Sequence, residues 1–138
     1  MRLPAPRPTA PAHRLLVVIE DDAALRATLA EWLRSWQFAV LAIDPARSLS
    51  IEGAHLAADA IIADFDLGLP SRSGLDMALG IARRVGHAIP TLVLSDSYGK
   101  REIAACSAHQ IPVLFKPLQA RELQFWLHRA VPSVSIDR

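Results

Sequence analysis

The chain has 138 residues, of which 51% are hydrophobic and 21% charged, and its formal net charge is +1. This length suits a single domain, and the composition excludes an intrinsically disordered chain. Acidic and basic side chains are interspersed, which argues against nucleic acid or a membrane surface as the main partner. Cys106 is the only cysteine, so an internal disulfide is excluded. No apolar run is long enough to cross a bilayer, and we expect a cytoplasmic protein.

The two ends of the chain differ in composition from its body. Residues 1–13 contain Pro4, Pro6, Pro8 and Pro11, which favour an extended linker or tail over a helix. Residues 132–138 lack helical periodicity after Pro132 and are interpreted as a second tail. The folded domain is therefore expected at residues 14–131.

Five short apolar runs recur through this body, and longer segments with helical spacing lie between them. The runs comprise residues 15–19, 38–43, 60–63, 91–94 and 113–115. Their mostly non-alternating character is typical of strands that are covered on both faces. Apolar residues at steps of three and four predict helices at residues 23–35, 75–85 and 119–130. Residues 47–56 and 98–108 carry weaker patterns that also predict helices.

This alternation predicts an α/β domain with a five-stranded parallel sheet and five helices divided between its two faces. In sheets of this kind, ligands bind beyond the carboxyl ends of the strands. Polar residues stand at those ends in the sequence. They are Glu20, Asp21 and Asp22 after the first strand, Asp64 and Asp66 after the third, Ser95 after the fourth and Lys116 after the fifth.

The residue types at this edge suit phosphoryl chemistry. Crowded carboxylates repel one another unless a cation neutralises them. Carboxylate oxygens without histidine or cysteine at ligand spacing favour Mg²⁺. An aspartate beside such a metal can attack a phosphoryl group and form an acyl phosphate. A lysine and a hydroxyl can then bind the phosphoryl oxygens.

The sequence resembles the receiver domain of response regulators and hybrid histidine kinases over nearly all of residues 14–130. The motifs that carry the resemblance are LLVVIEDD at residues 15–22, IIAD at 61–64, LVLS at 92–95 and FKP at 115–117. Each motif is weak alone, but the four occur in the family's order and at about its spacing. The resemblance implies a flavodoxin-like three-layer fold with strand order 2-1-3-4-5.

The resemblance also implies a role for each residue at this edge. Asp64 matches the phosphoacceptor, Ser95 the switch hydroxyl, and Lys116 the lysine that contacts the phosphoryl group. Glu20 and Asp21 match the acidic pair that binds Mg²⁺ together with Asp64. The backbone carbonyl of Asp66 matches a further metal ligand. The family pattern also implies a cis peptide bond before Pro117.

Two positions depart from the family's usual pattern. Gly74 lies ten residues after Asp64, where about eight are usual, so the loop between them is expected to be longer. Val113 stands where many receivers carry a switch aromatic, which puts the usual coupling between hydroxyl and aromatic in doubt. The residues from 112 to 118 resemble receivers at the C-terminus of hybrid kinases.

Some of these residues also have simpler interpretations. Asp22 is expected to cap the following helix rather than bind metal. Trp126 fits the buried stripe of the last helix, which leaves the adjacent Phe125 as a candidate for exposed contact, although half-burial is the more common outcome. Cys106 is interpreted as a small apolar core residue.

Two alternatives from other classes remain at this stage. A degenerate receiver would bind partners without being phosphorylated. A haloacid-dehalogenase-like phosphohydrolase would use Asp64 and Asp66 as nucleophile and acid-base pair. That family, however, places its DxD motif on the first strand, whereas here the acidic pair comes first.

The partners implied by the resemblance are a histidine kinase or a histidine phosphotransfer domain. The five histidines share no ligand spacing, and the chain lacks the helical bundle that carries a phosphodonor histidine. We therefore expect an acceptor that signals by protein–protein contact and is not a conventional turnover enzyme. The sequence leaves open the downstream partner, a weak homodimer, and whether the chain is a hybrid-kinase fragment.

Overall fold

The computed structural model describes residues 14–47, 57–70, 72–96 and 99–132. Five strands form one parallel sheet in the order β2-β1-β3-β4-β5, as the resemblance implies. The strands are β1 (Leu15–Ile19), β2 (Ala39–Ile43), β3 (Ala60–Asp64), β4 (Thr91–Ser95) and β5 (Val113–Phe115). The fold class predicted from the sequence, flavodoxin-like α/β, is confirmed.

Four helices are found in the described residues: α1 (Ala23–Ser35), α2 (Gly74–Val85), α3 (Lys100–Ser107) and α4 (Ala120–Ala130). The expected count was five. The additional helix was predicted at residues 47–56, and all of these but Arg47 lie outside the described residues. Among the described residues, no helix is long and apolar enough to cross a membrane.

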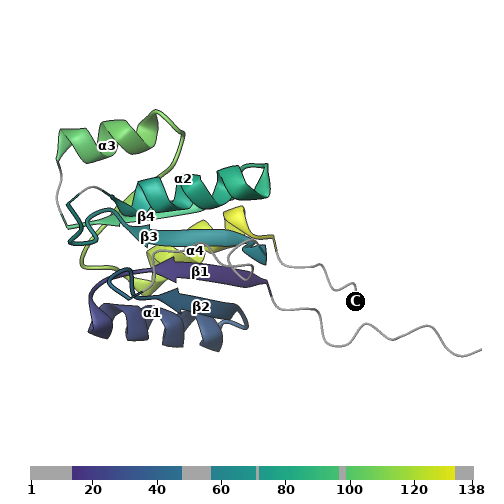
Figure 1. Ribbon diagram of the computed structural model, residues 1–138. Helices are drawn as coiled ribbons and strands as arrows, with labels where there is room; N and C mark the ends of the chain where they lie inside the picture. Colours follow the sequence, from purple (N-terminus) through teal and green to yellow (C-terminus); the bar gives the residue numbers. More distant parts are fainter. Residues whose placement is uncertain (1–13, 48–56, 71, 97–98, 133–138) are drawn as a thin grey trace, which may run out of the picture.

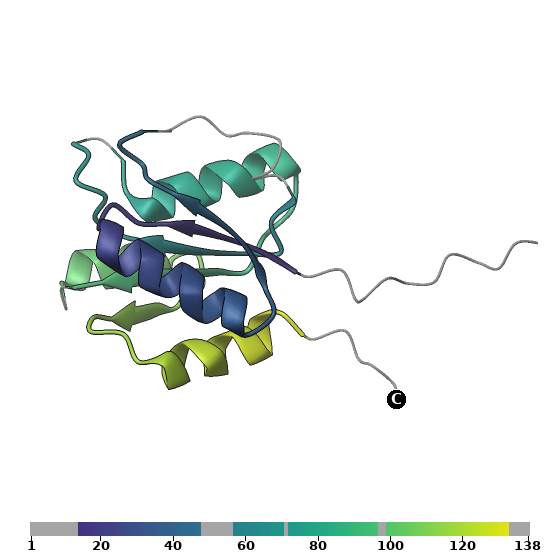
Figure 2. The same cartoon turned by 90° about the horizontal axis from the view of Figure 1, so that it is seen from below.

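The helices cover the sheet from both sides and make three layers (Figure 1). Leu29 and Leu33 of α1 share a buried cluster with Leu123 and Leu127 of α4, so these two helices pack on the same face. Figure 2 shows α1 in front of the strands. A second cluster joins Met77, Ala78 and Ile81 of α2 to the opposite face.

Side-chain alternation along the central strands divides the core between these layers. In β1, Leu16 and Val18 enter the cluster beneath α1 and α4, whereas Val17 and Ile19 enter the cluster beneath α2. All four side chains are fully buried. A strand that is covered on both faces needs apolar residues at successive positions, which explains the unbroken apolar runs. β1 and β3 are therefore packed between the two helical layers.

Side-chain caps define where α1 and α2 begin, near the carboxyl edge of the sheet. Asp22 caps α1 as predicted, and its Oδ1 accepts hydrogen bonds from the backbone N–H groups of Ala24 and Leu25 at 2.9 and 3.1 Å. Ser73 and Asp76 form a reciprocal capping box at the start of α2. Both helices therefore begin at defined points just beyond β1 and β3.

Candidate functional site

Three carboxylates meet where β1 and β3 end. Glu20 and Asp21 directly follow β1, and Asp64 is the last residue of β3. One carboxylate oxygen from each lies within 4.8 Å of the others. Glu20 is fully buried and Asp64 is 4% exposed, whereas Asp21 is open to solvent. The sheet order produces this meeting, because β1 and β3 are neighbours and run parallel.

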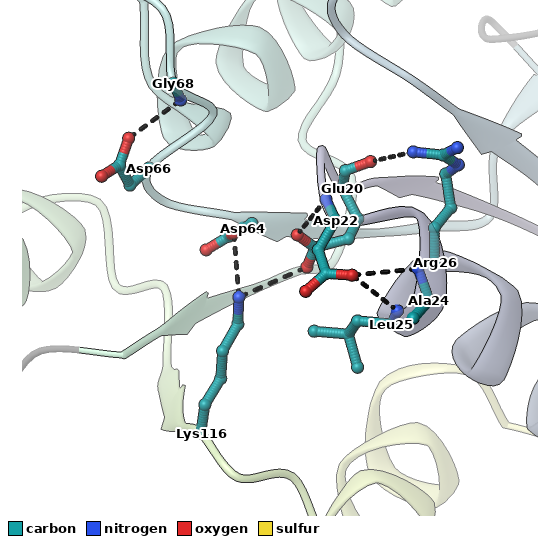
Figure 3. Close-up of polar contacts among 9 residues, drawn as sticks. All are labelled: Glu20, Asp22, Ala24, Leu25, Arg26, Asp64, Asp66, Gly68 and Lys116. Carbon is teal, nitrogen blue, oxygen red and sulfur yellow. Dashed lines mark hydrogen bonds and ion pairs between the residues drawn. The ribbon is translucent and has the colours of Figure 1, made fainter.

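Lys116 reaches this cluster from the residue after β5. Its Nζ lies 2.9 Å from Asp64 Oδ2 and 3.5 Å from Glu20 Oε1 (Figure 3). The first contact is a charge-assisted hydrogen bond, and the second is an ion pair without hydrogen-bond geometry. The peptide bond between Lys116 and Pro117 is cis, as the resemblance implies.

Glu20 is held through both its backbone and its side chain. Its N–H donates to the carbonyl of Ile43 at 3.2 Å, and its own carbonyl accepts from Arg26 Nη1 at 2.8 Å. Its Oε2 accepts from the backbone N–H of Asp22 at 3.1 Å. Its Oε1 is buried without a hydrogen-bond partner among the described residues. The oxygen that lacks a hydrogen bond thus belongs to a side chain whose backbone N–H and carbonyl are both hydrogen-bonded.

The electrostatics of the cluster favour the binding of a cation. The pKa of Glu20 is raised to about 8, mainly by burial and also by the Asp64 carboxyl beside it, against the opposing effects of the Asp22 N–H and the Lys116 charge. Burial also raises the pKa of Asp64. For Lys116, burial alone would lower the pKa, but the hydrogen bond and charge of Asp64 outweigh it and raise the pKa. One ammonium therefore only partly neutralises two buried carboxyls.

These residues fit a hard divalent cation such as Mg²⁺. The three side chains offer only oxygen ligands, and one of these is the buried Oε1 of Glu20, which accepts no hydrogen bond from the described residues. Mg²⁺ usually keeps several waters and binds through one or two carboxylates together with phosphate oxygens. The open position of Asp21 leaves a solvent side for those waters.

The loop between β3 and α2 lies beside Asp21. Asp66 forms an isolated antiparallel bridge with Ser73, which closes the base of the loop. Asp66 Oδ1 accepts from the N–H of Gly68 at 2.9 Å, so its side chain turns to its own loop and away from Lys116 (Figure 3). Gly68 has φ +71°, and a Cβ there would lie 3.5 Å from Asp21 Oδ2. The longer loop expected from the sequence therefore borders the site.

The start of α2 is also tied to Asp64. A Cβ on Gly74 would lie 1.9 Å from the backbone oxygen of Asp64 and 2.9 Å from Ala63 Cβ. The Gly74 N–H donates to the carbonyl of Phe65 at 3.0 Å. Only glycine fits where the first residue of α2 packs against the backbone of β3.

Of the remaining predicted residues, Ser95 also lies on this edge of the sheet. Ser95 ends β4, is 3% exposed, and its carbonyl accepts from the N–H of Lys116 at 2.8 Å. Leu94, its neighbour, is the register partner of Asp64. Val113 is half-buried and packs with Cys106 and Val93 beneath α3. Cys106 is fully buried, as predicted, and Phe125 is 65% exposed.

Arg26 was missed in the reading of the sequence. Its Nη1 donates a hydrogen bond to the Glu20 carbonyl. Its Nη2 lies 4.0 Å from Oδ2 of Asp44, the residue that follows β2. The only available signal was an arginine one turn into the helix that follows the acidic pair. Such an arginine usually lies on a solvated helix face. The sequence pattern alone does not distinguish that position from a hydrogen bond to the Glu20 carbonyl.

Comparison with known proteins places this site in a family. The sequence model of the response regulator receiver domain matches residues 16–127, and the chain belongs to this family. The phosphohydrolase alternative is therefore set aside. No curated protein shows significant similarity to the chain.

Solved structures of receivers share the fold. The chemotaxis protein CheY4 of Vibrio cholerae has a TM-score of 0.69 at 17% identity, covering 87% of this chain and all of that one. The HemR receiver domain of Leptospira biflexa has a TM-score of 0.68 at 23% identity, covering 91% and 99%. The receiver domain of a sensor histidine kinase from Pseudomonas aeruginosa, with a magnesium ion coordinated in its active-site cleft, has a TM-score of 0.68 at 22% identity, covering 88% and 100%.

Proposed function

We propose that this receiver domain accepts a phosphoryl group on Asp64 from the phosphohistidine of a histidine kinase or histidine phosphotransfer domain. The proposed metal ligands are Glu20, Asp21, Asp64 and the backbone carbonyl of Asp66. The observation that carries the proposal is the contact of Lys116 Nζ with Asp64 Oδ2 at 2.9 Å, beside two further carboxylates. A nucleophilic carboxylate, a cation site and a fixed ammonium thus occur together at the edge where such sheets bind ligands.

The proposed step is an in-line displacement at phosphorus. A carboxylate oxygen of Asp64 forms the new O–P bond while the P–N bond to the donor imidazole breaks, and the nitrogen keeps the electron pair of that bond. Bound Mg²⁺ would offset charge on the phosphoryl oxygens. Lys116 would move from Asp64 to a phosphoryl oxygen, and the Ser95 hydroxyl would bind another.

Water would hydrolyse the acyl phosphate, which releases inorganic phosphate and returns Asp64 to its carboxylate. The domain would then act as an acceptor that slowly dephosphorylates itself rather than as a turnover enzyme. Its signal would pass to another protein by surface contact, in the cytoplasm. The parent protein could be a response regulator or a hybrid histidine kinase.

The test is intact mass spectrometry after incubation with phosphoramidate or acetyl phosphate in the presence of MgCl₂. We expect a gain of one phosphoryl group in the native chain and none in Asp64→Asn. Chelation of the metal should also abolish the gain. Asp64→Asn keeps the size and packing of the side chain, so that a folded but inactive variant isolates the nucleophile.

A different result would favour the degenerate receiver. If the folded chain binds Mg²⁺ but gains no mass with either donor, the domain would act as a binding module independent of phosphorylation. Gain of a phosphoryl group in Asp64→Asn would instead move the acceptor to another residue.

A further inference from the structure

Arg26 lies behind the acidic cluster and contacts the ends of two strands at once. Its Nη1 donates to the Glu20 carbonyl at 2.8 Å after β1, and its Nη2 lies 4.0 Å from Asp44 Oδ2 after β2. The Arg26 side chain is 20% exposed and that of Asp44 is 28% exposed. The hydrogen bond to the carbonyl is therefore partly shielded from water. The longer ion pair with Asp44 contributes less to holding the two strand ends together.

The Glu20 carbonyl depends on this contact because the sheet no longer supplies one. The ladder between β1 and β3 ends at Ile19, which pairs with Ala63. Glu20 follows as the first residue of the turn into α1, and its N–H still bonds to Ile43 of β2. From the helix that follows, Arg26 thus donates to the carbonyl of the same residue (Figure 3). A partly buried carbonyl without a partner would be costly and would favour a different turn.

We infer that Arg26 is a positioning residue for the cation site. It fixes the turn between β1 and α1 so that the Glu20 and Asp21 carboxylates lie within reach of Asp64. This inference rests on the proposed function, since it takes the acidic cluster to be the Mg²⁺ site. Within the described residues, no hydrogen bond or ion pair joins Arg26 to the three ligand carboxylates, so it acts through the backbone of Glu20.

The sign of the effect separates this role from simple electrostatics. Arg26 carries a positive charge close to a site for another positive charge. If charge alone mattered, its removal should tighten Mg²⁺ binding. If Arg26 positions the ligands, its removal should weaken Mg²⁺ binding, because ligands held by outer contacts lose affinity when these are removed.

The experiment is a titration of the metal-free, unphosphorylated chain with MgCl₂, followed by amide chemical shifts in NMR spectra. Arg26→Met removes the charge and the hydrogen bond but keeps the length of the side chain. The matched control is Arg34→Met on the same helix. Arg34 Nη2 also donates to a backbone carbonyl, that of Val40 at 3.3 Å, but its contact is exposed and lies on β2.

We expect Arg26→Met to weaken Mg²⁺ binding about 5- to 10-fold, at the low end of the range for outer contacts because Arg26 holds backbone rather than a ligand oxygen. Arg34→Met should stay within about twofold of the native chain. The inference is overturned if Arg26→Met binds as tightly as the native chain or more tightly. It is equally overturned if Arg34→Met weakens binding to the same extent, since the cause would then be a general loosening of α1.

Arg26→Lys provides a second route if Arg26→Met fails to fold. It keeps the charge and one donor but cannot hold both strand ends, so we expect binding about 2- to 4-fold weaker than in the native chain. Unchanged or tighter binding would again overturn the inference. Phosphoryl acceptance at saturating MgCl₂ is a separate readout. Its absence from the native chain would refute the proposed function while the affinity comparison still decides the role of Arg26.

Discussion

The half of the domain that forms the acidic site is built differently from the half around β5. Every residue of β3 is buried, whereas all three residues of β5 are only half-buried. Helices α1 and α2 begin with side-chain caps, from Asp22 and Ser73. Within the described residues, the N-cap positions of α3 and α4 are Gly99 and Gln119, and neither provides a side-chain hydrogen bond to the first turn.

This difference indicates a firmly held site beside a less constrained edge. Elements with weaker caps and less burial open at lower free energy than the core. The proposed nucleophile and cation ligands lie on the well-packed half, where their geometry is fixed before a ligand arrives. Lys116 comes from the other half, because it follows β5 directly. Its bond to Asp64 therefore joins the two regions.

The largest effect is expected at the contact between Gly74 and Asp64. Gly74→Ala places a Cβ 1.9 Å from the Asp64 backbone oxygen, so β3 and α2 must separate. We expect a loss of about 3 kcal/mol or more in the free energy of unfolding, measured with urea. The control is Gly86→Ala at the end of α2, where φ is +93° but a Cβ has open space. It should cost about 1 kcal/mol. Equal losses would show that the site edge is more plastic than the packing implies.

The next effect is the pH dependence of the metal-free protein. The pKa of Glu20 is raised from 4.5 to about 8 in the folded state. Between these values the folded state binds more protons than the unfolded state, so the free energy of unfolding falls as pH rises. Asp64, whose pKa is also raised, acts in the same direction. The raised pKa of Lys116 acts only at higher pH, above its normal value of 10.5.

Urea unfolding in the presence of a chelator measures this fall. We expect a loss of about 1–3 kcal/mol from about pH 5 to about pH 8.5, with Glu20→Gln giving a flatter profile. Excess MgCl₂ should stabilise the native chain more at the higher pH, since protons then compete less for the carboxylates. A profile that is identical in Glu20→Gln would assign the pH dependence to other groups.

The caps offer a smaller and more direct comparison of the two halves. Asp22→Ala removes two hydrogen bonds to the first turn of α1 and should lower the free energy of unfolding by about 1 kcal/mol. Gln119→Ala at the start of α4 removes no such bond and should stay within about 0.5 kcal/mol. Urea denaturation midpoints measure both. If Gln119→Ala is as costly as Asp22→Ala, the difference in capping does not distinguish the halves.

The sequence predicted the features that depend on local pattern. The apolar runs at residues 15–19 and 113–115 have the bounds of β1 and β5, and the periodic segment 23–35 has those of α1. Apolar character and spacing determine these elements because burial on one or two faces requires them. Polar residues at strand ends then predicted which side chains share an edge. The cis bond before Pro117 followed from the resemblance.

Features that depend on the detailed geometry of turns and packing were not visible in the sequence. The bond from Arg26 to Glu20 requires the exact turn between β1 and α1, and the fit of Gly74 requires the packing of α2 on β3. Helix α3 begins at Lys100, two residues later than predicted, and the predicted position 98 lies outside the described residues. Its pattern is polar and alanine-rich, so periodicity fixes its ends poorly.

The smallest effect is expected at Phe125, on the less constrained edge. Its ring is 65% exposed, and the Arg129 guanidinium carbon lies 5.7 Å from the ring centroid. Phe125→Ser therefore loses little burial and one exposed cation–π contact, and should change the free energy of unfolding by no more than about 0.5 kcal/mol. The comparison on the same helix is Leu123→Ala, where full burial predicts a loss of about 2–5 kcal/mol.

Urea denaturation of both variants decides whether α4 has the two distinct faces that the structure shows. A loss above about 1 kcal/mol in Phe125→Ser would mean that the ring packs more firmly than its exposure indicates. A neutral result would show that folding does not require the aromatic ring.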